Sequence, residues 1–165
     1  MIGFFILTSC NNKEKEFDEN LRVAYTQLVK SLVTSTDVCE QVSTTWYNAI
    51  QNRRTPSGKY CNDFNEALDE LFTSLRQNGV IDELKAQSIG LIETASLLVN
   101  PPDSRKECYD DFVELVSIAK QLNRKASDPS GTYRSYNDEV HELAQELTEE
   151  FDKFRIKYSQ FTGYQ

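Results

Sequence analysis

Residues 17–50 read FDENLRVAYTQLVKSLVTSTDVCEQVSTTWYNAI, and this stretch decides the fold of the chain. Its apolar and small residues recur in steps of three and four, the period that places side chains on one face of an α-helix. The segment 31–37 is polar and partly β-branched, which would allow a kink. The stripe keeps its phase across that segment, which favours one continuous helix. The stripe consists of Phe17, Leu21, Ala24, Leu28, Leu32, Ser35, Cys39, Val42, Trp46 and then Ala49 or Ile50.

This first helix is predicted to cover residues 14–54, about 40 residues without a proline or glycine. Arg53 and Arg54 are cations of the kind that favour a helix C-terminus, and the turn residues Thr55-Pro56-Ser57-Gly58 follow them. The same periodicity predicts later helices over residues 62–77, 82–99, from 104 onward, and 133–161. Phe64 and Ile92 are placed on the buried faces of two of these helices.

Several residues are predicted to begin or end the later helices. Asn62 or Asp63 is expected to cap the second helix, with Glu66 in its first turn. Gly79 is expected to end that helix in a left-handed conformation. Ser104, with Glu107 three residues later, is expected to form a capping box at the start of the fourth helix.

The pattern as a whole predicts an all-α protein, an antiparallel helical bundle of four to five helices with a long first helix. No stretch alternates apolar and polar residues as a half-buried strand does. A chain of 165 residues is large enough for one domain with a proper core, which we place at residues 17–162.

Charge and cysteine content narrow the classes of partner. The net charge of −8, from 26 acidic and 18 basic residues, disfavours nucleic acid and disfavours docking on anionic lipid through surface charge. The four cysteines include no C-x-x-C pair, which disfavours a metal site or a disulfide framework. We therefore expect Cys39, Cys61 and Cys108 to be structural thiols.

No motif predicts catalysis, and we expect no catalytic residue, cofactor or metal. His141-Glu142-Leu143-Ala144-Gln145 lacks the second histidine of a zinc-peptidase helix, and His141 is the one histidine in the chain. The acidic residues of the last helix lie mostly off its apolar stripe, as on a solvated face. Pro56-Ser57-Gly58-Lys59 lacks the first glycine of a phosphate-binding loop and the Ser or Thr after its lysine.

The N-terminal stretch Leu7-Thr8-Ser9-Cys10 resembles the lipobox of bacterial lipoproteins. The resemblance implies a partial signal segment at residues 1–9, a lipid on Cys10, a polar tether at 10–16, and anchoring on the extracytoplasmic face of the cell membrane. The apolar run is too short for a transmembrane helix. No Lys or Arg precedes Cys10, so either translation starts upstream of Met1 or the segment is not an export signal.

The first guess at a contact patch is Arg53, Arg54, Lys59 and Tyr60, which share one expected turn. Four short groups of residues along most of the chain loosely resemble uncharacterised helical proteins of Gram-positive bacteria, several of them exported, and this resemblance implies no activity. The groups are Trp46 with Ala49-Ile50, Asp63-Phe64-Asn65 with Ala67-Leu68, Asn100-Pro101-Pro102 with Tyr109, and Pro129-Ser130-Gly131. The leading hypothesis is a lipid-anchored bundle acting through protein or envelope contacts, for example of the prophage exclusion or immunity type. The alternatives are a cytoplasmic helical interaction module and an enzyme with an unrecognised site.

Overall fold

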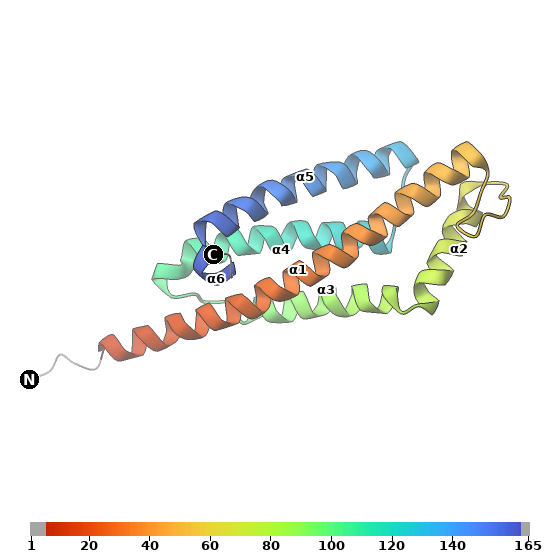
Figure 1. The fold of residues 1–165 in the computed structure, drawn as a ribbon. Helices are drawn as coiled ribbons and strands as arrows, with labels where there is room; N and C mark the ends of the chain where they lie inside the picture. The colour runs from red at the N-terminus through yellow and green to blue at the C-terminus, as the bar shows by residue number, and fades with distance from the viewer. Residues whose placement is uncertain (1–5, 163–165) are drawn as a thin grey trace, which may run out of the picture.

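Helices make up most of the computed structural model, which describes residues 6–162 and, within them, the side chains from Asn12 onward (Figure 1). Among these residues no β-strand occurs, and one isolated bridge joins Arg54 to Tyr60. The all-α prediction is thus confirmed. The elements are α1 (Ile6–Asn52), α2 (Phe64–Gln77), α3 (Val80–Ser96), the 3-10 helix η1 (Asp103–Arg105), α4 (Lys106–Ser127), α5 (Tyr133–Lys157) and α6 (Ser159–Thr162).

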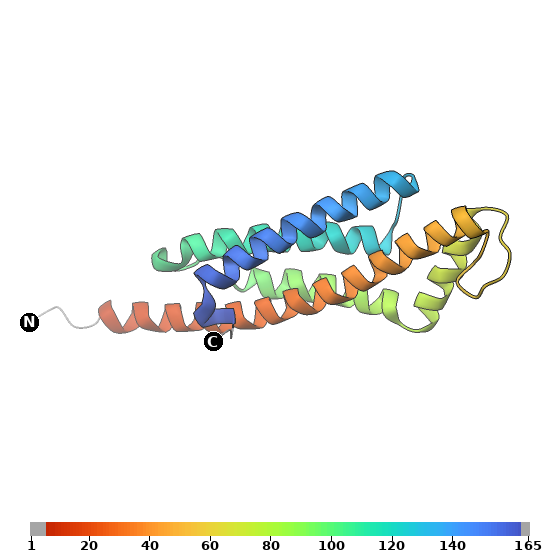
Figure 2. The same ribbon diagram turned by 45° about the horizontal axis from the view of Figure 1, so that its top comes forward.

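Helix α1 is the spine of the fold and runs without a break through residues 31–37, as its stripe predicts. Ser31 and Ser35 are 1% and 0% exposed there, so the polar segment lies inside the bundle. The helix begins at Ile6, eight residues before the predicted start, because no glycine or proline stops it in that region. Residues 10–16, which we predicted as a tether, are therefore helical, and the first turns of α1 extend beyond the other helices (Figures 1 and 2).

The helices alternate in direction, so that α1 and α4 run one way and α3 and α5 the other (Figure 1). Helix α1 packs mainly on α4 and α3, and α4 packs in turn on α5. Helix α2 folds back from the end of α1 and leads into α3 (Figure 2). The far end of α1 and the connection to α2 thus form one tip of an elongated bundle.

The core runs along the seam between α1, α3, α4 and α5 and is rich in large side chains. Tyr136 and Phe112 are 0% exposed, and the Tyr136 hydroxyl donates a hydrogen bond to the Lys125 carbonyl at 3.2 Å. Two assignments to the core were wrong. Phe64 and Ile92 are 37% and 48% exposed, because they lie at the edges of their helical stripes. Of the two residues that could end the stripe of α1, Ala49 is buried and Ile50 is exposed.

Two predicted helix ends are confirmed. Asp63 caps α2, and its carboxylate accepts from the backbone N–H groups of Asn65 and Glu66 at 2.7 and 3.2 Å. Gly79 has a φ of 76°, in the left-handed region that glycine tolerates, and its N–H donates to the Arg76 carbonyl. The chain therefore bends at residues 78–79, where α2 leads into α3 (Figure 1).

Three other ends differ from the prediction. Ser104 does not cap α4, because its hydroxyl donates to Glu14 of α1 at 2.6 Å and α4 begins at Lys106 without a side-chain cap. Helix α3 ends at Ser96 rather than at residue 99, where the chain tightens into turns with i→i−3 bonds. Helix α5 ends at Lys157, because Tyr158 leaves the helical conformation and donates its hydroxyl to Asp111 at 2.8 Å.

Candidate contact surface at the bundle tip

The loop that follows α1 is a short, hydrogen-bonded hairpin rather than a loose connection. We call residues 53–63 the tip loop. Thr55 N–H donates to the Lys59 carbonyl at 2.9 Å, and Cys61 N–H donates to the Arg53 carbonyl at 3.0 Å. Gly58 turns the chain with a φ of 81°, a conformation that L side chains rarely adopt. The hairpin therefore fixes the direction in which its side chains point.

The two arginines of the predicted patch take part in holding this loop. Arg53 Nη1 donates to the Asn62 carbonyl at 2.5 Å, and Arg54 Nη1 donates to the Gly58 carbonyl at 2.9 Å. Arg53 also has a φ of 53°, so a residue with a side chain occupies a position that favours glycine. Both arginines remain exposed, so they shape the loop and still carry charge at its surface.

Contacts with α1 and α2 hold the tip loop in place. Cys61 is 0% exposed and packs in a small cluster with Ala49 of α1 and Ala67 of α2. From α2, the Glu70 carboxylate accepts a hydrogen bond from the Ser57 N–H at 2.8 Å. Hydrogen bonds from Ser57 lower the pKa of Glu70 below its ordinary value of 4.5. The loop is thus tied to both helices that flank it.

An aromatic cluster lies beside the tip loop, centred on the buried Trp46. The Trp46 ring lies 5.4 Å from the ring of Phe64 and 5.6 Å from that of Tyr136, measured between centroids. The outer members of this region are exposed, and we call them the aromatic surface: Tyr47 (49%), Ile50 (45%), Tyr60 (67%) and Phe64 (37%). Exposed aromatic side chains are typical of protein interfaces.

All four predicted patch residues lie in the tip loop, and three further exposed side chains that the sequence did not assign to the patch lie on the helices flanking it: Tyr47, Ile50 and Phe64. Phe64, and Ile50 as an alternative to Ala49, were assigned to helical stripes, so their periodicity indicated burial, whereas Tyr47 lies off the predicted stripe. The missing signal is geometric: α1 continues past the start of α5, which leaves part of its last turns uncovered (Figure 1). The uncovered turns become visible only when the positions of the helix ends relative to one another are known.

The tip loop carries a net positive charge, unlike the chain as a whole. Residues 47–64 contain Arg53, Arg54 and Lys59 against Asp63, a net charge of +2 (three minus one) in a chain of net charge −8. The Asp63 carboxylate is engaged at the N-terminus of α2. Glu66 and Glu70 of α2 also bond to the loop, through the N–H groups of Asn62 and Ser57, so the net positive charge belongs to the tip loop and not to the helix beside it.

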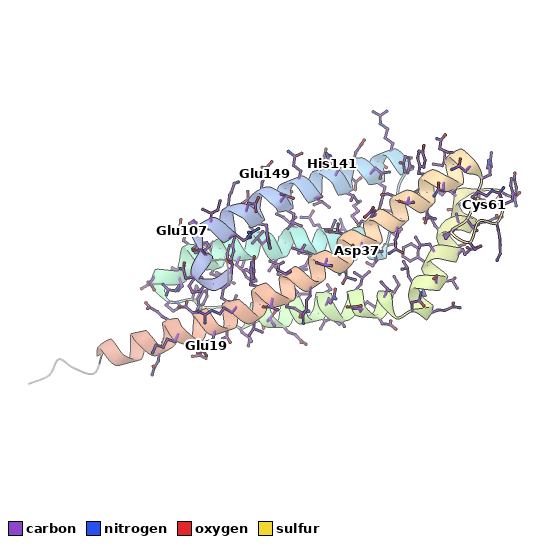
Figure 3. The ribbon with its side chains drawn as sticks, viewed as in Figure 1. Glu19, Asp37, Cys61, Glu107, His141 and Glu149 are labelled. Atoms are coloured by element: carbon purple, nitrogen blue, oxygen red, sulfur yellow. The ribbon has the colours of Figure 1, made fainter. Side chains whose placement is uncertain are left out.

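The other candidates from the sequence do not gather into a site in the described part of the chain. His141 lies exposed on α5, and Figure 3 shows it far from Cys61, which lies in the tip loop. Cys39, Cys61 and Cys108 are free and buried, as expected for structural thiols. Among the described residues, no group of three His, Cys, Asp or Glu side chains could hold a metal ion.

The side chain of Cys10 lies outside the described side chains, although its backbone belongs to α1. None of the described helices combines the length and the apolar character needed to cross a bilayer. The chain was compared with protein-family models, with curated proteins and with solved structures, and none of the three comparisons gave a match.

Proposed function

We propose that this protein is a lipid-anchored, extracytoplasmic helical bundle that holds a protein-binding tip away from the membrane. The proposal combines the lipobox at Leu7-Thr8-Ser9-Cys10 with the contact surface at the other end of the bundle. In this role the chain binds a partner and performs no catalysis. Lipoproteins of this kind carry more than one acyl chain, which stable anchoring requires.

The observation that carries the proposal is the continuity of α1. Cys10 and Asn52 are 42 residues apart in one unbroken helix, which corresponds to about 60 Å at a rise of about 1.5 Å per residue. Figure 3 shows Glu19 in the first third of this helix and Cys61 beyond the helix's other end. A lipid on Cys10 would therefore leave the tip loop free to meet a partner well outside the bilayer.

The side chains at the tip indicate the polarity and charge of the surface that a partner would use. The aromatic surface supplies rigid apolar area, and Arg53, Arg54 and Lys59 supply positive charge around it. A matching surface on the partner would be apolar at its centre and acidic at its edge. Because the loop is fixed by its own hydrogen bonds, little ordering entropy is lost when the partner binds.

Acyl labelling in a bacterial host tests the anchor. The coding region is first read upstream of Met1 for an in-frame start and basic codons, and the longer chain is expressed if one is present. We expect the protein to incorporate labelled fatty acid, to accumulate as a precursor with globomycin, and to sediment with membranes. Cys10→Ala is the control and should lose all three properties. An unlabelled protein that stays in the soluble fraction would favour the cytoplasmic interaction module instead.

A photo-crosslinking residue in place of Tyr60 tests the tip. We expect a discrete adduct that is lost when Arg54 and Lys59 are both changed to Glu, because reversed charge repels an acidic partner. The control places the same crosslinker at Val33, which is 58% exposed on the middle of α1. An adduct of equal yield at Val33, or one that survives the charge reversal, would contradict the proposed surface.

A further inference from the structure

The connection between α3 and η1 exposes two apolar side chains at the end of the bundle opposite the tip. We call residues 97–102, Leu-Leu-Val-Asn-Pro-Pro, the base loop. Leu97 is 59% exposed and Val99 is 53% exposed, while Leu98 between them is 1% exposed. The buried Leu98 holds the loop to the core and leaves its two neighbours in solvent.

The base loop is held in this conformation by its own backbone. Three successive N–H groups, those of Leu97, Leu98 and Val99, donate to carbonyls three residues earlier. Asn100 has a φ of 65°, and two prolines follow it and restrict the backbone further. The backbone of the loop therefore keeps Leu97 and Val99 exposed to solvent. Burying them would require these backbone hydrogen bonds to break.

The base loop also lies beside the segment of α1 that leads to Cys10. Just after the loop, the Ser104 hydroxyl donates to the Glu14 carboxylate at 2.6 Å. An open hollow of about 650 Å³ separates the two segments and is lined by residues 97–104 and by α1 residues between Lys13 and Asn20. Glu14 is one helical turn, about 6 Å of rise, beyond Cys10.

We propose that Leu97 and Val99 enter the interfacial layer of the bilayer when Cys10 carries its lipid, and so give the bundle a second membrane contact. This inference rests on the proposed anchor. Charges at this end are balanced locally, since Lys106 pairs with Asp103 at 2.7 Å and Arg105 pairs with Asp18 at 2.8 Å. The contact is therefore apolar and does not depend on anionic lipid. Two contacts fix the inclination of α1, whereas a lipid alone would let the bundle pivot.

Tryptophan fluorescence on vesicles tests this contact directly. The full chain is coupled through Cys10 to a maleimide lipid in phosphatidylcholine vesicles, and mass spectrometry verifies the site of coupling. The variants Leu97→Trp and Val99→Trp are compared with Val33→Trp, whose position is equally exposed on the middle of α1. Trp46 lies near the distal tip in every variant and gives a constant background. We expect brominated lipid to quench the emission at positions 97 and 99 and to leave position 33 unchanged.

A paired substitution gives a second measurement. Leu97→Ser with Val99→Ser should lower the vesicle affinity of the lipid-coupled chain roughly tenfold, because it removes the partial burial of two apolar side chains. Val33→Ser is the matched control and should leave the affinity unchanged. Unquenched emission at positions 97 and 99 would overturn the inference, as would a concentration-dependent blue shift without vesicles, which would show that a second copy covers the loop. Because the lipid is attached chemically, these outcomes are separate from a failure of Cys10 to be acylated in cells.

Discussion

Arg105 and Asp18 form a two-pronged ion pair that joins the end of η1 to α1. Arg105 Nε lies 2.8 Å from Asp18 Oδ1, and Arg105 Nη2 lies 3.0 Å from Asp18 Oδ2. The guanidinium also lies over the ring of Phe161 in α6, 5.7 Å from its centroid. The carboxylate of Asp18 raises the pKa of Arg105, which is the direction expected for a paired cation. One side chain thus links three elements at the base of the bundle.

Removing this pair should destabilise the fold measurably. The side chains of Arg105 and Asp18 are 26% and 20% exposed. The arginine binds the carboxylate through two nitrogens, which makes a stronger ion pair than a single contact does. We expect Arg105→Ala to lower the free energy of unfolding by about 1–2 kcal/mol and Asp18→Asn by about 1 kcal/mol. Urea unfolding followed by circular dichroism measures both, and the double variant gives the coupling energy.

The exposed pair Arg134–Asp138 on α5 is the control for that experiment. Its nitrogen and oxygen are 3.8 Å apart, and its side chains are 92% and 66% exposed. Solvent screens such a pair, so Arg134→Ala should change stability by less than about 0.5 kcal/mol. Equal losses at the two pairs would show that the geometry at Arg105 contributes nothing special.

The start of α5 should be more sensitive to capping than the start of α4. Thr132 caps α5, and its hydroxyl accepts from the Ser135 N–H at 3.1 Å while the Ser135 hydroxyl accepts from the Thr132 N–H at 2.9 Å. Thr132→Ala should cost about 1 kcal/mol. Ser104→Ala should cost less, because that hydroxyl bonds to Glu14 at the surface and caps no helix. Thermal unfolding compares the two variants, and a larger effect at Ser104 would contradict the observed caps.

The contrast between these two positions shows how far the sequence could predict the fold. Ser104 and Glu107 have the spacing of a capping box, but Ser104 lies beside α1 and its hydroxyl finds Glu14 instead. Asp63 and Gly79 were assigned correctly, because their partners are local backbone groups. Local spacing predicts a helix end well until a distant segment competes for the same side chain.

At the tip too, features that depend on neighbouring residues could be predicted from the sequence, and features that depend on distant segments could not. A turn at residues 55–58 follows directly from its residue types, and the four charged and aromatic residues near it could be grouped from sequence. The exposure of Ile50 and Phe64 could not, because it depends on how far the neighbouring helices extend beside them. The continuity of α1 through residues 31–37 was predictable for the opposite reason, because one unbroken stripe is a local property.

The tip loop should loosen in acid, through Glu70. Hydrogen bonds from Ser57 lower the pKa of this carboxyl below 4.5, so the folded state favours the ionised form. Its stabilising contribution is fully present above pH 4.5 and is lost as the pH falls through the lowered pKa. The amide shift of Ser57, measured by NMR, should titrate with a midpoint below 4.5. In Glu70→Gln this titration should disappear, and its persistence would mean that another group controls the loop.

The buried thiols should be unreactive in the folded protein. Cys39, Cys61 and Cys108 are 2%, 0% and 3% exposed, and burial raises the pKa of Cys108 to about 12. A disulfide reagent at pH 8 should therefore modify these three only after unfolding in urea. Comparison with Cys10→Ala assigns any fast-reacting thiol in the native chain. Rapid modification of Cys108 in the native state would contradict the described packing.

From the raised pKa of the Cys108 thiol we expect the folded state to lose stability in alkali. The folded state retains the Cys108 proton up to about pH 12, whereas the unfolded chain releases it near the ordinary value of 9.0. Unfolding is therefore favoured as the pH rises above about 9. Burial also raises the pKa of Tyr158 to about 12, which acts in the same direction from about pH 10. The urea midpoint should fall between pH 8 and pH 10.5, and less steeply in Cys108→Ala.

Ser35 offers the sharpest test of the buried face of α1. Its hydroxyl and that of Ser31 are buried, and neither has a hydrogen-bond partner within the described part of the chain. Ser35→Ala removes a buried hydroxyl and adds helix propensity, so we expect it to stabilise the fold by about 1 kcal/mol. Thr34→Ala is the control and should destabilise it, because Thr34 Oγ1 accepts from Gln87 Nε2 at 3.0 Å. If Ser35→Ala were instead less stable, an internal water would have to bridge the two serines, and this face would be a hydrated one.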